Sequence, residues 1–445
     1  MGAFYRSILE TSGGGGGSDY SYTATIGGTP LQTSFDYYFA NNKTMISNNI
    51  VIGDNVDNCC YMFNNSNFNA PITIGNNVKN CCNMFSSDIY FNCPVNIPDS
   101  VTNCAFMFAS AYNLNQPVII GNNVDNCGYM FDQARNFNQP LTIPDSVNYC
   151  YGILRGASNY NSTLTLGNNC NCVSLFQATT INGTVIIPDG VTNCKMMFNN
   201  SQSFRGSAVL GNNVIDCEQM FHGCPNYNQP ITIPNSVRRC NTMFYACYNL
   251  NSEITINEGV ENCYQMFYSC NRFNVPVYIP NSVKICGSMF QSATNFNQEV
   301  HISENAISCE QMFLGCNNYN QPTIIPNSVT TIRAMFQGCN NFNQPITIPS
   351  SVYNCNMFLL SAKNFNSDIY CERTNNQMVV GQMLNQMFNN CRKNVHFHPY
   401  LNNVFNLTGA SSVVGTTITW TDMEDGNGFY NTAYNIYCYN NYVSE

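Results

Sequence analysis

A methionine–phenylalanine pair, or a close substitute for it, recurs along this chain every 22 or 23 residues. A unit of this length cannot bury its own apolar face and must stack on its neighbours, so the spacing predicts a repeat solenoid. The second residue of the pair stands at Phe63, Phe85, Phe108, Phe131, Leu154, Phe176, Phe198, Phe221, Phe244, Phe267, Phe290, Phe313, Phe336 and Phe358.

Each repeat also contains a short apolar alternation, such as Ile231-Thr232-Ile233, which has the two-residue period of a strand. Prolines on both sides, Pro230 and Pro234 in this copy, limit the strand to about three residues. In "VRRCNTMFYAC" (237–247) the apolar residues are three to four apart, which predicts a short helical return. The expected fold is an α/β repeat solenoid of about fifteen coils, each a short parallel strand plus a helical or 3₁₀ segment.

The stretch "IPNSVTTIRAMFQGCNNFNQPITI" (325–348) carries these columns in their fullest form. It resembles the BspA-like leucine-rich repeats of bacterial surface proteins almost column by column, and the resemblance extends over residues 50–371. It implies a ladder of parallel strands with helical returns. The departures are that Cys replaces the family's Ile in most coils, and that Phe or Tyr followed by Asn replaces its Leu.

Twenty-five cysteines raise the question of disulfides, metal or catalysis. Because Cys behaves as a small buried hydrophobe, we expect a column of free buried thiols, Cys127 being one rung. Disulfides between adjacent coils are the alternative, since a coil spacing of about 5 Å suits them; the odd count and the lack of an export signal argue against them. The column comprises Cys59, Cys81, Cys104, Cys127, Cys150, Cys172, Cys194, Cys217, Cys240, Cys263, Cys286 and Cys309, with Ile332 next and Cys355 displaced by one.

No metal or other cofactor is expected. Paired C-x-x-C motifs are missing, the adjacent Cys59-Cys60 and Cys81-Cys82 are expected to point to different sides, and His396 and His398 lack a third ligand. A cysteine nucleophile needs a particular His beside it, and the four histidines are scattered at 222, 301, 396 and 398. The sequence therefore does not predict an enzyme.

An asparagine follows the second aromatic residue of nearly every repeat, with Arg205 as the exception. An amide side chain both donates and accepts hydrogen bonds, so a stack of asparagines can satisfy backbone groups of the turns. We expect this structural role for Asn69, Asn92, Asn115, Asn138, Asn161, Asn182, Asn228, Asn251, Asn274, Asn297, Asn320, Asn343 and Asn366.

Charged residues make up only 9% of the chain and the net charge is −9, which argues against nucleic-acid binding. No apolar run approaches the ~18 residues of a membrane-spanning helix, so membrane insertion is not expected. The N-terminus lacks the basic and apolar regions of a secretory signal, so synthesis in a bacterial cytoplasm is expected.

The ends of the chain differ from the repeats. Residues 1–17 are predicted to be a docking peptide and a glycine-rich tether, and residues 18–49 an N-terminal cap. Beyond the solenoid of residues 50–371, residues 372–398 are predicted to form an irregular capping coil. Residues 399–445 are predicted to form a β-rich cap or small domain.

This arrangement resembles tail-associated virion proteins of bacteriophages. The resemblance implies a place on the phage tail, contacts with other tail proteins through the N-terminal segment, and binding of a host cell-surface glycan or protein; a homo-oligomer is compatible with it. Two alternatives stay open. One is a structural or decoration protein of the tail or capsid, and the other is a bacterial BspA-like surface adhesin.

Ligand binding is expected on the solvent-facing row formed by the central residues of the strand triplets. Most residues of this row are small and β-branched, as on any exposed strand. Tyr278, His301 and Tyr370 depart from that pattern, which directs the prediction to the C-terminal half. The candidate ligand-binding residues are Thr232, Thr255, Tyr278, His301, Thr347 and Tyr370.

Overall fold

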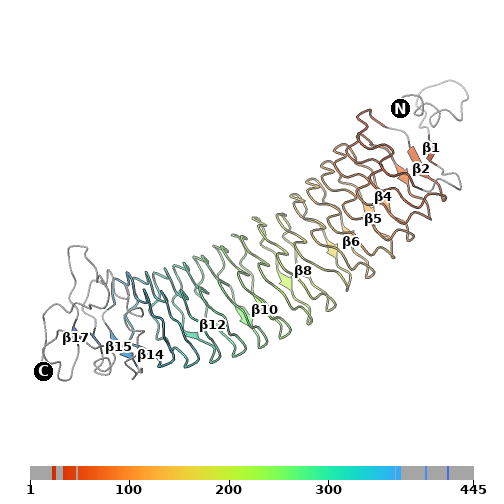
Figure 1. Ribbon diagram of the computed structural model, residues 1–445. Helices are drawn as coiled ribbons and strands as arrows, with labels where there is room; N and C mark the ends of the chain where they lie inside the picture. Colours follow the sequence, from red (N-terminus) through yellow and green to blue (C-terminus); the bar gives the residue numbers. More distant parts are fainter. Residues whose placement is uncertain are drawn as a thin grey trace, which may run out of the picture. The chain divides into compact units, whose positions relative to one another are not determined.

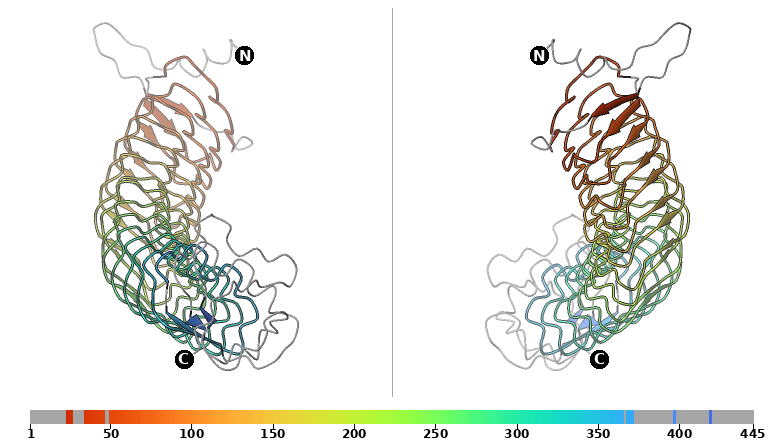
Figure 2. Two further views of the ribbon diagram at one scale, coloured as in Figure 1. Left: turned by 90° about the vertical axis from the view of Figure 1, so that its left-hand side faces the viewer. Right: turned by 90° about the vertical axis from the view of Figure 1, so that its right-hand side faces the viewer.

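The computed structural model describes residues 23–26, 34–46, 49–365, 367–371, 396–397 and 418–419. The chain divides into two compact units, residues 1–214 and 215–445. Within each unit, successive coils lie side by side and form a parallel β-solenoid, as Figures 1 and 2 show. The expected docking peptide and tether at 1–17 lie outside the described residues, as does the expected C-terminal domain apart from residues 418–419.

Each strand is short because it occupies the apolar triplet of one repeat. In the first unit the strands are β1 (Thr23–Ile26), β2 (Asn49–Ile52), β3 (Ile72–Thr73), β4 (Val95–Asn96), β5 (Val118–Ile119), β6 (Leu141–Thr142), β7 (Leu164–Thr165), β8 (Val185–Ile186) and β9 (Ala208–Val209). In the second unit they are β10 (Ile231–Ile233), β11 (Ile254–Ile256), β12 (Val277–Tyr278), β13 (Val300–His301), β14 (Ile346–Ile348), β15 (Asp368–Cys371), β16 (His396–Phe397) and β17 (Ile418–Thr419).

The strand register places equivalent residues of successive repeats beside one another. Strands β10 and β11 are parallel, with Thr232 opposite Thr255. β1 and β2 pair in the same parallel way, and β16 pairs parallel with β15, whereas β16 and β17 are antiparallel. Residues 323–325, which form no strand, keep the buried–exposed–buried pattern of the triplets. Stacking in this register turns each sequence column into a column in space.

The predicted helical return is wrong, because the described residues contain no helix. A right-handed helix needs negative φ throughout, whereas the return reaches φ 56° at Tyr129 and 57° at Gln133. The amide N–H groups alternate between two kinds of acceptor. Met130 N–H donates to Cys127 O of its own coil (3.2 Å), and Phe131 N–H donates to Ile153 O of the next coil (2.8 Å). Overlapping turns thus replace the helix.

The core of each coil is filled by stacked aromatic rings. The rings of Phe267 and Phe290 are 5.5 Å apart between centroids and 6° from parallel, and those of Phe290 and Phe313 are 5.7 Å apart and 3° from parallel. These separations lie in the favourable range for offset aromatic pairs. All three side chains are fully buried. The phenylalanine column is therefore a stack of near-parallel rings here, and it ends at Phe358, whose ring meets that of Phe336 edge-on at 73°.

The expected role of the asparagine column is confirmed. Asn138 Oδ1 accepts the backbone N–H of Asn161 at 2.8 Å, and Asn161 Oδ1 accepts that of Asn182 at 2.8 Å. Even at the exception, Arg205 N–H donates to Asn182 Oδ1 at 2.9 Å. The side-chain amides therefore connect coil to coil alongside the backbone. The same bond occurs at Asn69, Asn92 and Asn115 in the first unit and at Asn228, Asn251, Asn274, Asn297 and Asn320 in the second.

Among the described residues there is no helix long and apolar enough to cross a membrane.

Candidate ligand-binding face

The candidate residues, all in the second unit, lie on the solvent-exposed face of the strand ladder. Thr232 and Thr255 face each other across β10 and β11, and both are exposed between buried isoleucines. Thr347 is exposed on β14 and lies opposite Tyr370 of β15 in the register. The backbone of Tyr370 is described but its side chain is not. The strands thus bring the predicted residues into a single row.

Tyr278 and His301 form the most distinctive part of this row. They are register partners on β12 and β13, and their rings stack with centroids 5.3 Å apart and planes 3° from parallel. The Tyr278 side chain is 57% exposed. Because each ring covers one face of the other, a ligand can reach only the outer faces and the ring edges.

The neighbours of this ring pair differ in size. β11 contacts β12 and contributes the short Thr255 side chain on the side of Tyr278. Ile324, in the repeat after His301, is 81% exposed. The Tyr278 ring therefore projects further than the neighbouring Thr255 side chain, which leaves a step in the row. Ile324 supplies exposed apolar surface beyond His301.

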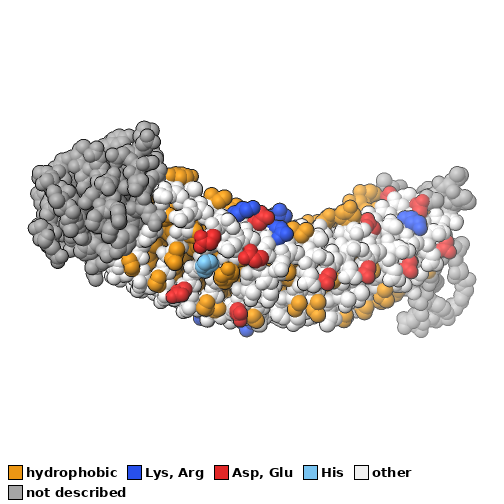
Figure 3. Space-filling view, turned by 90° about the horizontal axis from the view of Figure 1, so that it is seen from below, with side chains coloured by type: hydrophobic (Ala, Val, Ile, Leu, Met, Phe, Trp, Pro, Cys, Tyr) orange, Lys and Arg blue, Asp and Glu red, His pale blue; other side chains and the backbone are white. Residues whose placement is uncertain are grey.

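Charge contributes little to the described surface, most of which is uncharged in the face shown in Figure 3. In the second unit, Arg239 pairs with Asp216 at 2.7 Å, so that pair neutralises itself. The row can offer threonine hydroxyls, ring edges and an apolar side chain. These groups suit a neutral ligand that presents both hydroxyls and apolar surface.

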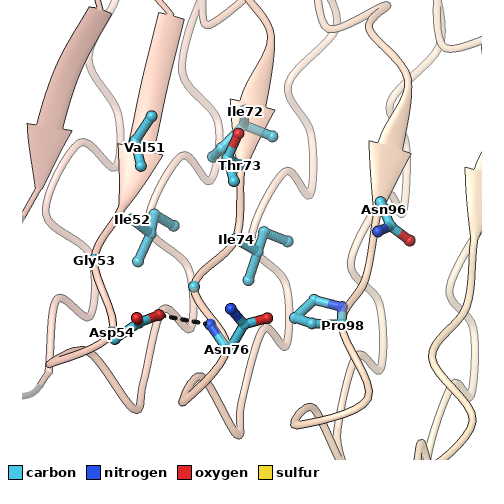
Figure 4. Close-up of a pocket in the computed structure, with 11 residues that line it drawn as sticks. Val51, Ile52, Gly53, Asp54, Ile72, Thr73, Ile74, Asn76, Asn96 and Pro98 are labelled. Carbon is cyan, nitrogen blue, oxygen red and sulfur yellow. Dashed lines mark hydrogen bonds between the residues drawn. The ribbon is translucent and has the colours of Figure 1, made fainter.

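The first unit contains a feature that the sequence did not lead us to expect. A shallow hollow of about 470 Å³ lies along β2, β3 and β4, and Thr73, Asn96 and Asp54 are among its lining residues (Figure 4). Asp54 Oδ1 accepts the N–H of Asn76 at 3.0 Å, so one carboxylate oxygen is already engaged. Gly75 is required here because a Cβ would lie 2.6 Å from Ile52 O. The alternation of exposed polar residues on these strands is the only sequence signal for it.

The prediction of a buried, unbridged thiol column is confirmed for Cys127 and for most of its partners. It is wrong for Cys150, which forms a disulfide with Cys170; Cys60 and Cys82 form a second disulfide between adjacent coils. Burial raises the pKa of the Cys59 thiol to about 12, so this thiol is protonated at neutral pH and is a poor nucleophile. The unbridged members are Cys59, Cys81, Cys104, Cys127, Cys172, Cys194, Cys217, Cys240, Cys263, Cys286, Cys309 and Cys355.

Although the sequence has no paired C-x-x-C motifs, the structure brings three cysteines together. The sulfur atoms of Cys150, Cys170 and Cys172 all lie within 4.8 Å of one another, and all three residues are buried. The available sequence signal was the C-x-C spacing of Cys170 and Cys172, where neighbouring repeats have a valine three residues before the cysteine.

These features define a class of protein: a parallel repeat β-solenoid with a buried thiol and aromatic core and an uncharged exposed row. The chain belongs to the family described as "Mycoplasma protein of unknown function, DUF285", which matches residues 33–143, 98–186, 171–277, 234–327 and 307–404. A search of curated proteins gave no match.

Three solved structures are similar at low identity. A leucine-rich cell surface protein from Faecalibacterium prausnitzii A2-165 is 17% identical over 81% of this chain and 85% of that one, with a TM-score of 0.40. A leucine-rich repeat protein from Bacteroides ovatus ATCC 8483 is 17% identical over 68% and 79%, with a TM-score of 0.48. One from Eubacterium ventriosum ATCC 27560 is 16% identical over 68% and 79%, with a TM-score of 0.32.

None of these matches is described as a phage protein or as an enzyme. The expected phage-tail resemblance therefore gains no support from them. The bacterial surface-protein alternative is compatible with them.

Proposed function

We propose that this chain is a non-enzymatic binding protein of the bacterial leucine-rich surface type, and that its exposed row in the second unit contacts the ligand. The observation that carries the proposal is the stacked Tyr278–His301 pair, exposed beside the 81%-exposed Ile324. Single exposed apolar side chains are ordinary, but neighbouring ones indicate an interaction site. The close sequence match of residues 325–348 to the BspA-like motif supports the surface role.

The chemistry of the row favours a glycan as the ligand. Sugar rings have apolar C–H faces that pack on aromatic rings, and hydroxyl groups that bond to threonine and to ring edges. The step between Tyr278 and Thr255 leaves the outer face of the tyrosine ring open to such contact. The row contains no Asp, Glu, Lys or Arg, so a neutral sugar meets no fixed charge of the row itself. A protein ligand is the competing outcome.

A glycan-array experiment with the full chain tests the proposal. Replacing Tyr278 and His301 together by Ala should weaken binding about tenfold, because two ring contacts of about 0.5–1.5 kcal/mol each sum to about 1–3 kcal/mol, and ~1.4 kcal/mol is a factor of ten. The matched control replaces Thr142 and Thr165, which are paired in the same column of the first unit. Unchanged glycan binding by the folded Tyr278/His301 variant would move the site elsewhere. Binding only to cell-surface proteins would reject the proposal that the ligand is a glycan.

A further inference from the structure

The three clustered cysteines come from two successive coils of the first unit. Cys150 belongs to the thiol column of one coil, while Cys170 and Cys172 stand at the corresponding corner of the next. Their sulfur atoms lie within 4.8 Å of one another, and the residues are no more than 1% exposed. Cys150 Sγ also lies 3.0 Å from Asn171 O, so the corner of the second coil closes over the first.

Packing alone does not require this arrangement. The position of Cys170 is filled by a buried valine in the other coils of the first unit: Val56, Val78, Val101, Val124, Val147, Val191 and Val214.

The cluster coincides with the loss of one residue. Three positions separate Val124 from Cys127, but only two separate Cys170 from Cys172. The run of backbone bridges that links Asn126 to Tyr149 ends there, and residues 170–172 form no bridge. The deletion brings the valine column and the thiol column together, and a cysteine stands in both.

We propose that Cys150, Cys170 and Cys172, in their reduced form, bind one soft thiophilic metal ion, Cu(I) or Zn(II), through their three sulfur atoms. Thiolates select these ions over harder ones. No further His, Cys, Asp or Glu of the described residues joins the group, so the described part of the chain supplies three ligands. Three sulfurs suit trigonal Cu(I), whereas Zn(II) needs a fourth ligand from solution.

The disulfide between Cys150 and Cys170 must open before the ion binds. A phosphine reductant supplies the two electrons and becomes the phosphine oxide, with water providing its oxygen and the two thiol protons. Each coordinated thiol then releases its proton to solvent.

The experiment loads the full chain with Cu(I) or with Zn(II) after anaerobic reduction and desalting, and counts bound metal per chain by mass spectrometry. Cys170→Val restores the residue usual in its column and should bind one ion fewer than the unsubstituted chain. Cys127→Ala removes a thiol of the same column as Cys150 and should bind as many as the unsubstituted chain. Because twenty-five cysteines give a background, the difference between variants is decisive.

Equal metal content in the Cys170→Val and unsubstituted chains would overturn the proposal. So would no uptake by a chain whose thiol count proves full reduction, since the cysteines would then form only a disulfide. Should Cys170→Val fold poorly, Cys172→Ser provides the same comparison. Uptake of one of the two ions alone, with its ultraviolet thiolate charge-transfer band, identifies the metal.

Discussion

Replacing Asn138 by Ala should loosen one defined hydrogen bond and no other backbone contact. Asn138 Oδ1 accepts the Asn161 N–H at 2.8 Å, while the N–H of residue 138 itself donates to Asn115 Oδ1 at 3.0 Å and survives the substitution. The net value of one such bond is about 1 kcal/mol. Asn138 and Asn161 are both exposed, so water can reach the freed N–H and no burial penalty is added.

Hydrogen-exchange mass spectrometry of the peptide that contains Asn161 measures this loss. About 1 kcal/mol corresponds to roughly fivefold faster exchange of that amide if it opens locally. Asn138→Asp keeps an acceptor oxygen and should exchange close to the unsubstituted rate. The Asn251 amide, bonded to Asn228 in the second unit, serves as an internal reference. Equal rates for Asn138→Ala and Asn138→Asp would refute the reasoning.

Two further predictions concern the buried core. Phe267→Ala removes a ring stacked between Phe244 and Phe290 and should cost about 3–5 kcal/mol, seen as a lower urea midpoint; a midpoint close to the original would contradict the stack. Burial raises the pKa of Asp88 to about 6, so the folded chain holds this proton more tightly than the unfolded chain. Stability should therefore fall by about 3 kcal/mol as pH rises from about 4 to about 6 and then level off. In the Asp88→Ser variant, thermal unfolding measured against pH should no longer show this fall in stability. If the fall persists, another titrating group causes it.

The repeat made much of the architecture predictable. Each column is sampled many times along the chain, so the burial of Phe290 or Cys127 follows from the pattern of all copies. The asparagine bonds were predictable for the same reason, since one amide per coil at a turn has few other uses.

The return was mispredicted because a spacing of three to four apolar residues fits overlapping turns as well as a helix. The sign of φ is not contained in that spacing. A weak signal was present, since the second position after the phenylalanine is glycine at Gly223, Gly315 and Gly338, all with positive φ. Elsewhere the same position holds Gln133 or Ser110, which conceals the requirement.

The sequence predicted the exposed row but not the cysteine cluster. The exposed row follows directly from strand alternation, but the stacking of Tyr278 on His301 depends on register, which only the structure gives. The cysteine cluster depends on a one-residue deletion that breaks the column alignment. A prediction based on what all repeats share does not detect a deletion in one of them.

The hydrogen bonds of the returns allow such chains to change length by whole coils. The backbone donors of a coil find their acceptors in that coil or in one of the two coils beside it: Met130 N–H bonds within its coil, Phe131 N–H to the following coil and Thr102 N–H to the preceding one. A whole coil can therefore be duplicated or lost while its neighbours keep a complete set of partners. A single lost residue has no such freedom and must be absorbed where it occurs, as at Cys170. Gene lengths in this family should accordingly vary in steps of one repeat, with the exposed row extended or shortened by one side chain each time.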